Sequence, residues 1–227
     1  GGGDGPGEAR DRGERHGVEA SGRGGQAGEH LGGGVGRGVR GDGDGRAQPG
    51  GADQRRGPLD GVPVSWKDLF DTGGTATESG SLLLKGRVPA ADARVLANAT
   101  AQGLICLGKP HMTELAFSGL GINPSTATPP NAIDPSLAPG GSSSGAAVSV
   151  ALCLAAAAIG SDTGGSVRNP AAWNGLVGLK TTHGRLSLDG VVPLIPRFDT
   201  VGPLTRSVED AALLLAVLEG TRPADLI

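Results

Sequence analysis

Apolar residues are distributed unevenly along the chain. The first 50 residues hold 20 of the 43 glycines and offer only Val18, Leu31, Val35 and Val39 as large aliphatic side chains. Such a segment cannot bury enough apolar surface to offset its conformational entropy. We therefore expect residues 1–57 to be disordered, or to derive from a shifted reading frame of a GC-rich gene, which yields the same Gly/Arg/Ala/Asp mixture.

From residue 58 onward the apolar positions follow the periods of strands and helices, and we place the start of a globular domain, 58–227, there. Short strands are predicted at 62–66 and 104–107. Between them, 92–101 is predicted as a helix, because Val95, Leu96 and Ala99 share one face. A strand, helix, strand order favours parallel pairing in a covered sheet.

The second half of this domain repeats the alternation. A short helix is expected at 112–118, then a polar, Pro-rich loop at 123–141, a buried helix at 144–155 and a buried strand at 156–160. A last helix is predicted after Ser207, because Ser207 and Asp210 form a capping-box pattern. This helix is expected to end at Gly220. Its expected apolar face consists of Val208, Ala211, Ala212 and Leu215.

Composition excludes several functional classes. The net charge is −3, and the charges before residue 50 alternate in sign, which argues against a nucleic-acid-binding arm. That segment also lacks aromatic residues for base stacking. No apolar run is long enough to span a bilayer, and the N-terminus has no apolar signal region, so we expect a cytoplasmic protein. Cys106 and Cys153 lie in apolar stretches, so we expect buried free thiols rather than a disulfide or a metal site.

Two glycine-serine segments carry candidate chemistry. PGGSSSG occupies 139–145 and DTGGSVR occupies 162–168. A Gly-Gly-Ser turn can expose a serine hydroxyl and aim successive amides at one point. Ser166 is therefore the candidate nucleophile, and the amides of Thr163, Gly164, Gly165 and Ser166 are candidate donors to the oxyanion of a tetrahedral intermediate. A loop of this kind at a strand end could equally hold a phosphate.

A serine nucleophile needs a base, and neither His111 nor His183 stands in a recognisable triad setting. Lys67 follows a predicted buried strand, where desolvation lowers the pKa of a lysine and makes its amine a base. Ser142 would relay the proton between Ser166 and this amine. A single lysine after a strand is usually a solvated surface residue, and a GGSSSG run is often a linker, so the hypothesis depends on their combination.

Four segments between Gly57 and Gly220 resemble the amidase signature family. They are GPLDGVPVSWKDLFDTGG, PGGSSSGAAVSVA, IGSDTGGSVRNPAAWNGLVGLK and DTVGPLTRSVEDAALLLAVLEG, in the family's order and spacing. The resemblance implies a catalytic Lys67, a bridging Ser142 on a cis peptide bond and an acylated Ser166. It also implies an oxyanion loop at Thr163, Gly164 and Gly165. Support for the loops is assigned to Gly140, Gly141, Ser143, Asp162 and Arg168.

The resemblance implies an α/β fold in which a mixed, mostly parallel sheet is covered by helices on both faces. It implies hydrolysis of a small-molecule carboxylic amide without metal or organic cofactor, and a homodimer is compatible with it. The A subunit of glutamyl-tRNA or aspartyl-tRNA amidotransferase, which works with partner subunits, shares these motifs. The sequence SWKDLFD and the absence of tyrosine favour the stand-alone hydrolases.

The chain also departs from the family pattern. Ser144 stands where many members have glycine, and TTHGR occupies 181–185 where Pro-Thr is commoner. Members of the family extend well beyond the position that corresponds to residue 227, so the resemblance implies a domain truncated on its C-terminal side. We therefore expect exposed apolar edges and low stability, and an inactive fragment is the third hypothesis.

Overall fold

The computed structural model describes residues 1–2 and 56–221. The Gly/Arg-rich segment that the sequence analysis sets apart lies almost entirely outside the described residues. Its predicted disorder and its boundary at residue 57 therefore stay predictions.

Five strands form one mixed sheet in the order β2-β1-β3-β5-β4. The strands are β1 (Pro63–Trp66), β2 (Ile105–Gly108), β3 (Ala157–Asp162), β4 (Val177–Gly178) and β5 (Thr200–Thr205). β1 pairs in parallel with β2 and β3, whereas β5 runs antiparallel to both β3 and β4. Four strands therefore share one direction and β5 opposes them, which confirms the mixed, mostly parallel sheet.

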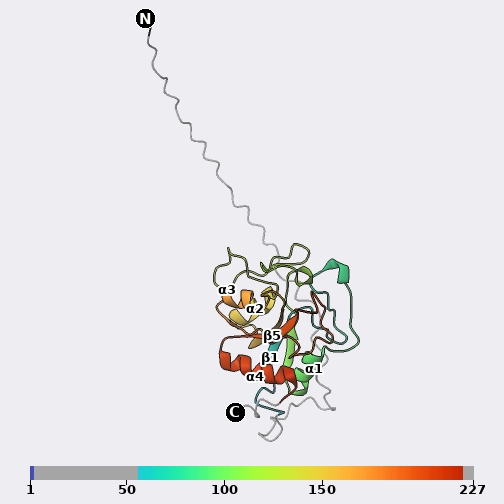
Figure 1. The fold of residues 1–227 in the computed structure, drawn as a ribbon. Coiled ribbons are helices and arrows are strands. Elements are labelled where there is room, and N and C mark those ends of the chain that lie inside the picture. Colours follow the sequence, from blue (N-terminus) through green and yellow to red (C-terminus); the bar gives the residue numbers. More distant parts are fainter. Residues whose placement is uncertain (3–55, 222–227) are drawn as a thin grey trace, which may run out of the picture. The chain divides into compact units, whose positions relative to one another are not determined.

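Helices cover both faces of this sheet (Figure 1). On one face, α2 (Ser144–Ala151) and α3 (Arg168–Trp173) pack on Ala158 and Leu204. On the other, α1 (Arg94–Ala101) and α4 (Val208–Glu219) pack on a larger core that includes Ile159 and Trp66. Successive residues of a strand point to opposite faces, so β3, buried along its whole length, supplies both cores.

The sequence predicts the first strand, helix and strand within two residues at each end. The predicted face of α1 is confirmed, because Val95, Leu96 and Ala99 are buried. In α4, the Ser207 hydroxyl accepts a hydrogen bond from the Asp210 amide, as the capping-box pattern predicts. Gly220 ends this helix with φ 83°, in the left-handed region that favours glycine.

Other predictions are wrong in detail. Segment 112–118 forms only a 3-10 turn, Glu114–Ala116, because Leu115 adopts a positive φ of 47° that interrupts a helix. A second 3-10 turn, Leu82–Leu84, was not predicted. The helix expected to reach residue 155 ends at Ala151, and β3 continues to Asp162 instead of stopping at residue 160.

The predicted apolar face of α4 is also wrong in part. Val208 and Ala212 are exposed, and the buried positions are Ala211, Leu214, Ala216, Val217 and Leu218. The run from Ala211 to Leu218 is apolar throughout, so hydrophobic periodicity alone does not define which face is buried.

The two cysteines differ in burial. Cys106 is half-buried, and burial raises the pKa of its thiol. Cys153 is exposed, which contradicts the prediction of a buried thiol. The reason is local, because α2 ends at Ala151 and the chain turns at Cys153 with a positive φ of 58°.

The edge of the sheet exposes apolar side chains. Ile105 and Leu107 of the edge strand β2 are each 52% exposed. No helix among the described residues is long and apolar enough to cross a membrane.

Candidate active site

Lys67 stands at the carboxyl end of β1, and its side chain is fully buried. Its backbone N–H donates to the Ile159 carbonyl on the adjacent parallel strand, at 3.0 Å. Its amine contacts two hydroxyls: Nζ lies 2.7 Å from Ser142 Oγ and 2.8 Å from Ser161 Oγ. Because parallel strands end at the same edge of a sheet, the end of β1 meets the end of β3 here.

Burial changes the acid-base chemistry of this lysine. Desolvation lowers the pKa of Lys67 to about 7, although the carboxylates of Asp162 and Asp199 oppose this by favouring the ammonium form. A large fraction of the amine is therefore neutral at physiological pH and can accept a proton. The buried strand that precedes Lys67 in the sequence predicts this lowering of the lysine pKa.

Ser142 lies in the turn that precedes α2, and it is fully buried. The peptide bond between Gly141 and Ser142 is cis, as the family resemblance implies. The Ser142 carbonyl accepts a hydrogen bond from the Thr113 amide at 3.1 Å. Only glycine fits at position 141, because an added Cβ would lie 2.6 Å from the Cα of Gly121.

The neighbouring glycine fixes the same turn. The Gly140 and Gly141 amides donate to the carbonyls of Leu120 and Gly119, at 3.0 and 2.8 Å. These bonds tie the serine-bearing turn to the loop at 119–121. The support role predicted for Gly140 and Gly141 stays a prediction.

Asp162 organises the loop that carries Ser166. Its carboxylate accepts hydrogen bonds from the amides of Gly165 and Val167, at 2.8 and 3.1 Å, and from the Arg168 guanidinium at 3.0 Å. Burial alone would raise the pKa of Asp162, but Arg168 and the amides outweigh it and hold this pKa below its ordinary value. The loop is therefore wrapped around a stable negative charge.

Ser166 is 8% exposed and follows Gly165, whose φ of 140° is open only to glycine. Its carbonyl accepts a hydrogen bond from the Ser143 amide at 3.2 Å, which joins the two serine loops. Within residues 56–221 its hydroxyl hydrogen-bonds no protein group. Lys67 thus contacts Ser142 directly. Ser166 is joined to this pair through the backbone of Ser143, the residue after Ser142.

The amides predicted to bind an oxyanion have different environments. The Gly165 N–H is directed at Asp162. In the described part of the chain, the Thr163, Gly164 and Ser166 amides donate to no protein acceptor. Those three amides are therefore the remaining candidate oxyanion donors, and the Gly165 amide holds the turn through Asp162.

Two residues of this region were not predicted. Ser161 is the second partner of the Lys67 amine, and Asp199 accepts a hydrogen bond from the Thr163 hydroxyl at 2.5 Å. A polar residue inside the apolar strand before Asp162 is the signal that could have indicated Ser161. The sequence offers no local signal for Asp199.

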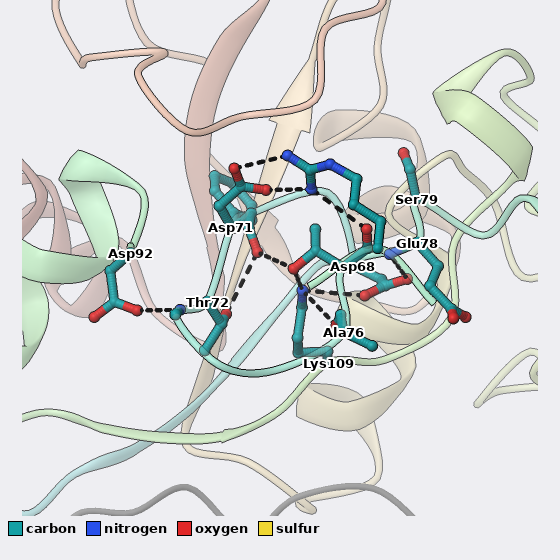
Figure 2. A network of polar contacts seen from close by, with 12 residues as sticks. Asp68, Asp71, Thr72, Ala76, Glu78, Ser79, Asp92 and Lys109 are labelled. Atoms are coloured by element: carbon teal, nitrogen blue, oxygen red, sulfur yellow. Dashed lines mark hydrogen bonds and ion pairs between the residues drawn. The ribbon is translucent and has the colours of Figure 1, made fainter. Parts of the chain in front are cut away.

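A second polar network fixes the turn after Lys67 (Figure 2). The Lys109 amine lies 3.2 Å from Asp68 Oδ1, and it also donates to the Ala76 carbonyl and the Thr77 hydroxyl. Burial raises the pKa of Asp68 and lowers that of Lys109, while the ion pair opposes both shifts. The backbone beside the site is therefore anchored to the segment that follows β2.

Neither histidine of the described region replaces Lys67. His183 Nε2 lies 3.1 Å from the Pro196 carbonyl, and the His111 backbone carbonyl accepts from the Gly145 amide at 2.8 Å. Neither imidazole hydrogen-bonds Ser166 in the part that the structure describes. A group of three metal-ligating side chains is likewise absent from that part.

Comparison with known proteins identifies the family of this chain. The family model for Amidase matches residues 44–227. The chain belongs to the amidase signature family. The A subunit of the glutamyl-tRNA(Gln) amidotransferase of Anaeromyxobacter dehalogenans is 47% identical over 173 residues, covering 76% of this chain and 35% of the relative. The mandelamide hydrolase of Pseudomonas putida is 44% identical over 174 residues, covering 74% and 34%.

Solved structures of amidases share this fold. The native peptide amidase of Stenotrophomonas maltophilia superposes with a TM-score of 0.71 at 42% identity, over 77% of this chain and 37% of that chain. The chain spans about a third of the length of the curated relatives it matches.

Proposed function

We propose that this chain carries the catalytic residues of an amidase that cleaves a carboxylic amide into an acid and ammonia or an amine. The observation that carries the proposal is the buried amine of Lys67, 2.7 Å from the Ser142 hydroxyl and with a pKa of about 7. A neutral amine beside a hydroxyl is a general base with a proton relay attached.

In the proposed first step the Ser166 hydroxyl attacks the amide carbonyl carbon. The hydroxyl proton passes to Ser142, whose own proton passes to Lys67. The carbonyl oxygen becomes an oxyanion, and the amides of Thr163, Gly164 and Ser166 stabilise it. Loss of one such donor costs about 3–4 kcal/mol in a protease where it has been measured.

In the second step the tetrahedral intermediate collapses and the carbon–nitrogen bond breaks. The Lys67 ammonium returns its proton through Ser142 to the leaving nitrogen, so ammonia or an amine departs and an ester on Ser166 remains. Water then attacks this ester while its proton passes through Ser142 to Lys67. The bond between the acyl carbon and Ser166 Oγ breaks, the proton returns to Ser166 Oγ, and the acid is released. Apart from the substrate and this water, each step uses only side chains and backbone amides of this chain.

A fluorophosphonate probe tests the nucleophile. The full-length protein should be labelled at Ser166, and Ser166→Ala should abolish labelling, because the probe reacts only with an activated serine. Ser136→Ala is a suitable control, since among residues 56–221 this exposed serine hydrogen-bonds only Asp134. Labelling that survives Ser166→Ala would contradict the assignment.

The second candidate function is the glutaminase component of a tRNA-dependent amidotransferase. It is favoured by the relative of Anaeromyxobacter dehalogenans, 47% identical and named as the A subunit of a glutamyl-tRNA(Gln) amidotransferase. This second function keeps the same chemistry but takes glutamine as the amide and requires partner subunits. Ammonia release from glutamine only in the presence of partner subunits would favour it, whereas turnover of aryl or aliphatic amides by the protein alone would favour the stand-alone amidase.

A further inference from the structure

Asp199 lies at the end of a turn immediately before β5, and it is 5% exposed. The antiparallel register pairs Asp162 with Thr200, and the Thr200 hydroxyl donates to the Asp162 carbonyl at 2.7 Å. This register places the residue before Thr200 beside the residue after Asp162. Asp199 is thereby brought to Thr163, the first residue of the loop that leads to Ser166.

The Asp199 carboxylate is held by neutral donors. The Thr163 hydroxyl donates to Oδ1 at 2.5 Å, and the amides of Leu194 and Ile195 donate at 2.9 and 3.0 Å. Hydrogen bonds to an ionised acceptor are stronger than neutral ones. The carboxylate therefore joins two segments, the turn at 194–199 and the loop at 163–166, through the Thr163 side chain.

The charge of Asp199 also acts on Lys67. Asp162 and Asp199 are the two carboxylates that favour the ammonium form of this lysine. Asp162 is engaged by the Arg168 guanidinium, whereas among residues 56–221 no lysine, arginine or histidine forms an ion pair with Asp199. The Asp199 charge is therefore not balanced by a guanidinium as that of Asp162 is.

We propose that Asp199 is a positioning residue of the active site, which orients the amides of Thr163 and Gly164 toward the oxyanion and provides a negative charge that stabilises the protonated relay. The inference rests on the proposed amidase function. It makes two separable claims, one about the Thr163 hydroxyl and one about the Asp199 charge.

The test measures the rate of fluorophosphonate labelling of the full-length protein against pH. Thr163→Val removes the hydroxyl but keeps the shape of the side chain, and Thr163→Ser restores the hydroxyl. Labelling should be roughly tenfold slower in Thr163→Val, which corresponds to loss of one hydrogen bond to a charged group, and close to wild type in Thr163→Ser. Asp199→Asn should also slow labelling, and the double variant should be no slower than the slower single variant, because both remove one interaction.

The pH midpoint of labelling separates the second claim from a purely structural role. The Asp199 charge favours the ammonium form of Lys67. In Asp199→Asn the Lys67 amine should therefore lose its proton at lower pH, and the midpoint of labelling should move to lower pH with it. Thr163→Val leaves the charges of Asp162, Arg168 and Asp199 in place, so its midpoint should match that of wild type. A variant that merely weakens the fold would lower the labelled fraction without moving the midpoint.

Equal labelling rates for Thr163→Val and Thr163→Ser overturn the proposal, even where Asp199→Asn does not fold. An unchanged midpoint in folded Asp199→Asn overturns the claim about charge. Failure of the full-length wild-type protein to label, or equal labelling of Ser166→Ala, would instead reject the proposed function. The two failures are therefore distinguishable.

Discussion

The Lys67 amine lies 2.8 Å from the hydroxyl of Ser161. A neutral amine has two N–H donors and one lone pair. If one N–H bonds to Ser161, the amine is held in an orientation that keeps its lone pair available to the Ser142 proton. Ser161 therefore restricts the rotation of a base whose side chain is otherwise long and flexible.

Ser161→Ala should slow fluorophosphonate labelling of Ser166 by roughly three- to tenfold, because one hydrogen bond contributes about 0.5–1.5 kcal/mol. Ser161→Thr, which keeps the hydroxyl, should restore the rate. Ser65→Ala is the matched control, since Ser65 hydrogen-bonds Ser149 at 2.8 Å and not the lysine. An equally slow labelling rate in Ser65→Ala would mean that Ser161→Ala acts through a general change in packing and not through the hydrogen bond to Lys67.

Lys67→Met should change the pH dependence of folding. The folded-state pKa of about 7 lies below the ordinary value of 10.5, so between these values the unfolded wild-type chain binds more protons than the folded one. Wild-type stability should therefore rise with pH across this window, by up to about 1.4 kcal/mol per pH unit relative to Lys67→Met. Denaturant unfolding at several pH values measures the difference.

The control for this comparison is Lys85→Met, because Lys85 is exposed. Its unfolding free energy should follow the wild-type pH dependence throughout. Parallel curves for wild type and Lys67→Met would show that the buried amine does not titrate in this range.

Asp162→Asn should destabilise the protein and slow the labelling of Ser166. The carboxylate is fully buried and holds the loop through two amides and Arg168. We expect a loss of about 1.5–3 kcal/mol at pH 7, the range for hydrogen bonds to charged groups, at its lower end because the half-exposed Arg168 is screened by solvent. Thermal or urea unfolding measures it.

This loss should depend on pH with a definite sign. The pKa of Asp162 is held below its ordinary value, so its contribution is complete above about 3.9 and is lost as pH falls through the lower folded-state value. The curves of wild type and Asp162→Asn should therefore converge in acid. Asp134→Asn, at an exposed carboxylate, should change stability little.

Gly145→Ala tests the packing of α2 against the segment before it. An added Cβ would lie 2.6 Å from the His111 nitrogen, which is backbone and cannot rotate away. We expect a loss of about 1–3 kcal/mol and slower labelling, because the start of α2 moves together with Ser142. Gly108→Ala is the control, since a Cβ there meets no atom within 4 Å.

Much of this site could be predicted from the sequence because its parts are local signals. Lys67 follows a short apolar strand, and Ser166 follows two glycines, so each is visible within a few residues. The face of α1 and the cap at Ser207 were predictable for the same reason. Ser142 was predictable through the family resemblance.

The remainder depends on pairing between distant segments. β5 was not predicted, because Gly202 and Pro203 are residues that strands disfavour. Without β5 the neighbour of Thr163 cannot be known, and the role of Asp199 stays hidden. Ser161 stands out as a polar residue in an apolar strand, but its contact with Lys67 could not be predicted, because which strand lies beside Lys67 is a property of the whole sheet.

The register between β3 and β5 has a consequence for folding and for protein engineering. β5 is separated from β3 in the sequence by α3 and a long connecting segment. The loop that carries Ser166 is therefore fixed by a non-local strand pairing, and such pairing forms slowly. A shortened version that stops before Thr200 would keep Lys67, Ser142 and Ser166 and still lack the strand that holds their neighbours in place. A polypeptide long enough to contain the reactive side chains would then still be too short to be active.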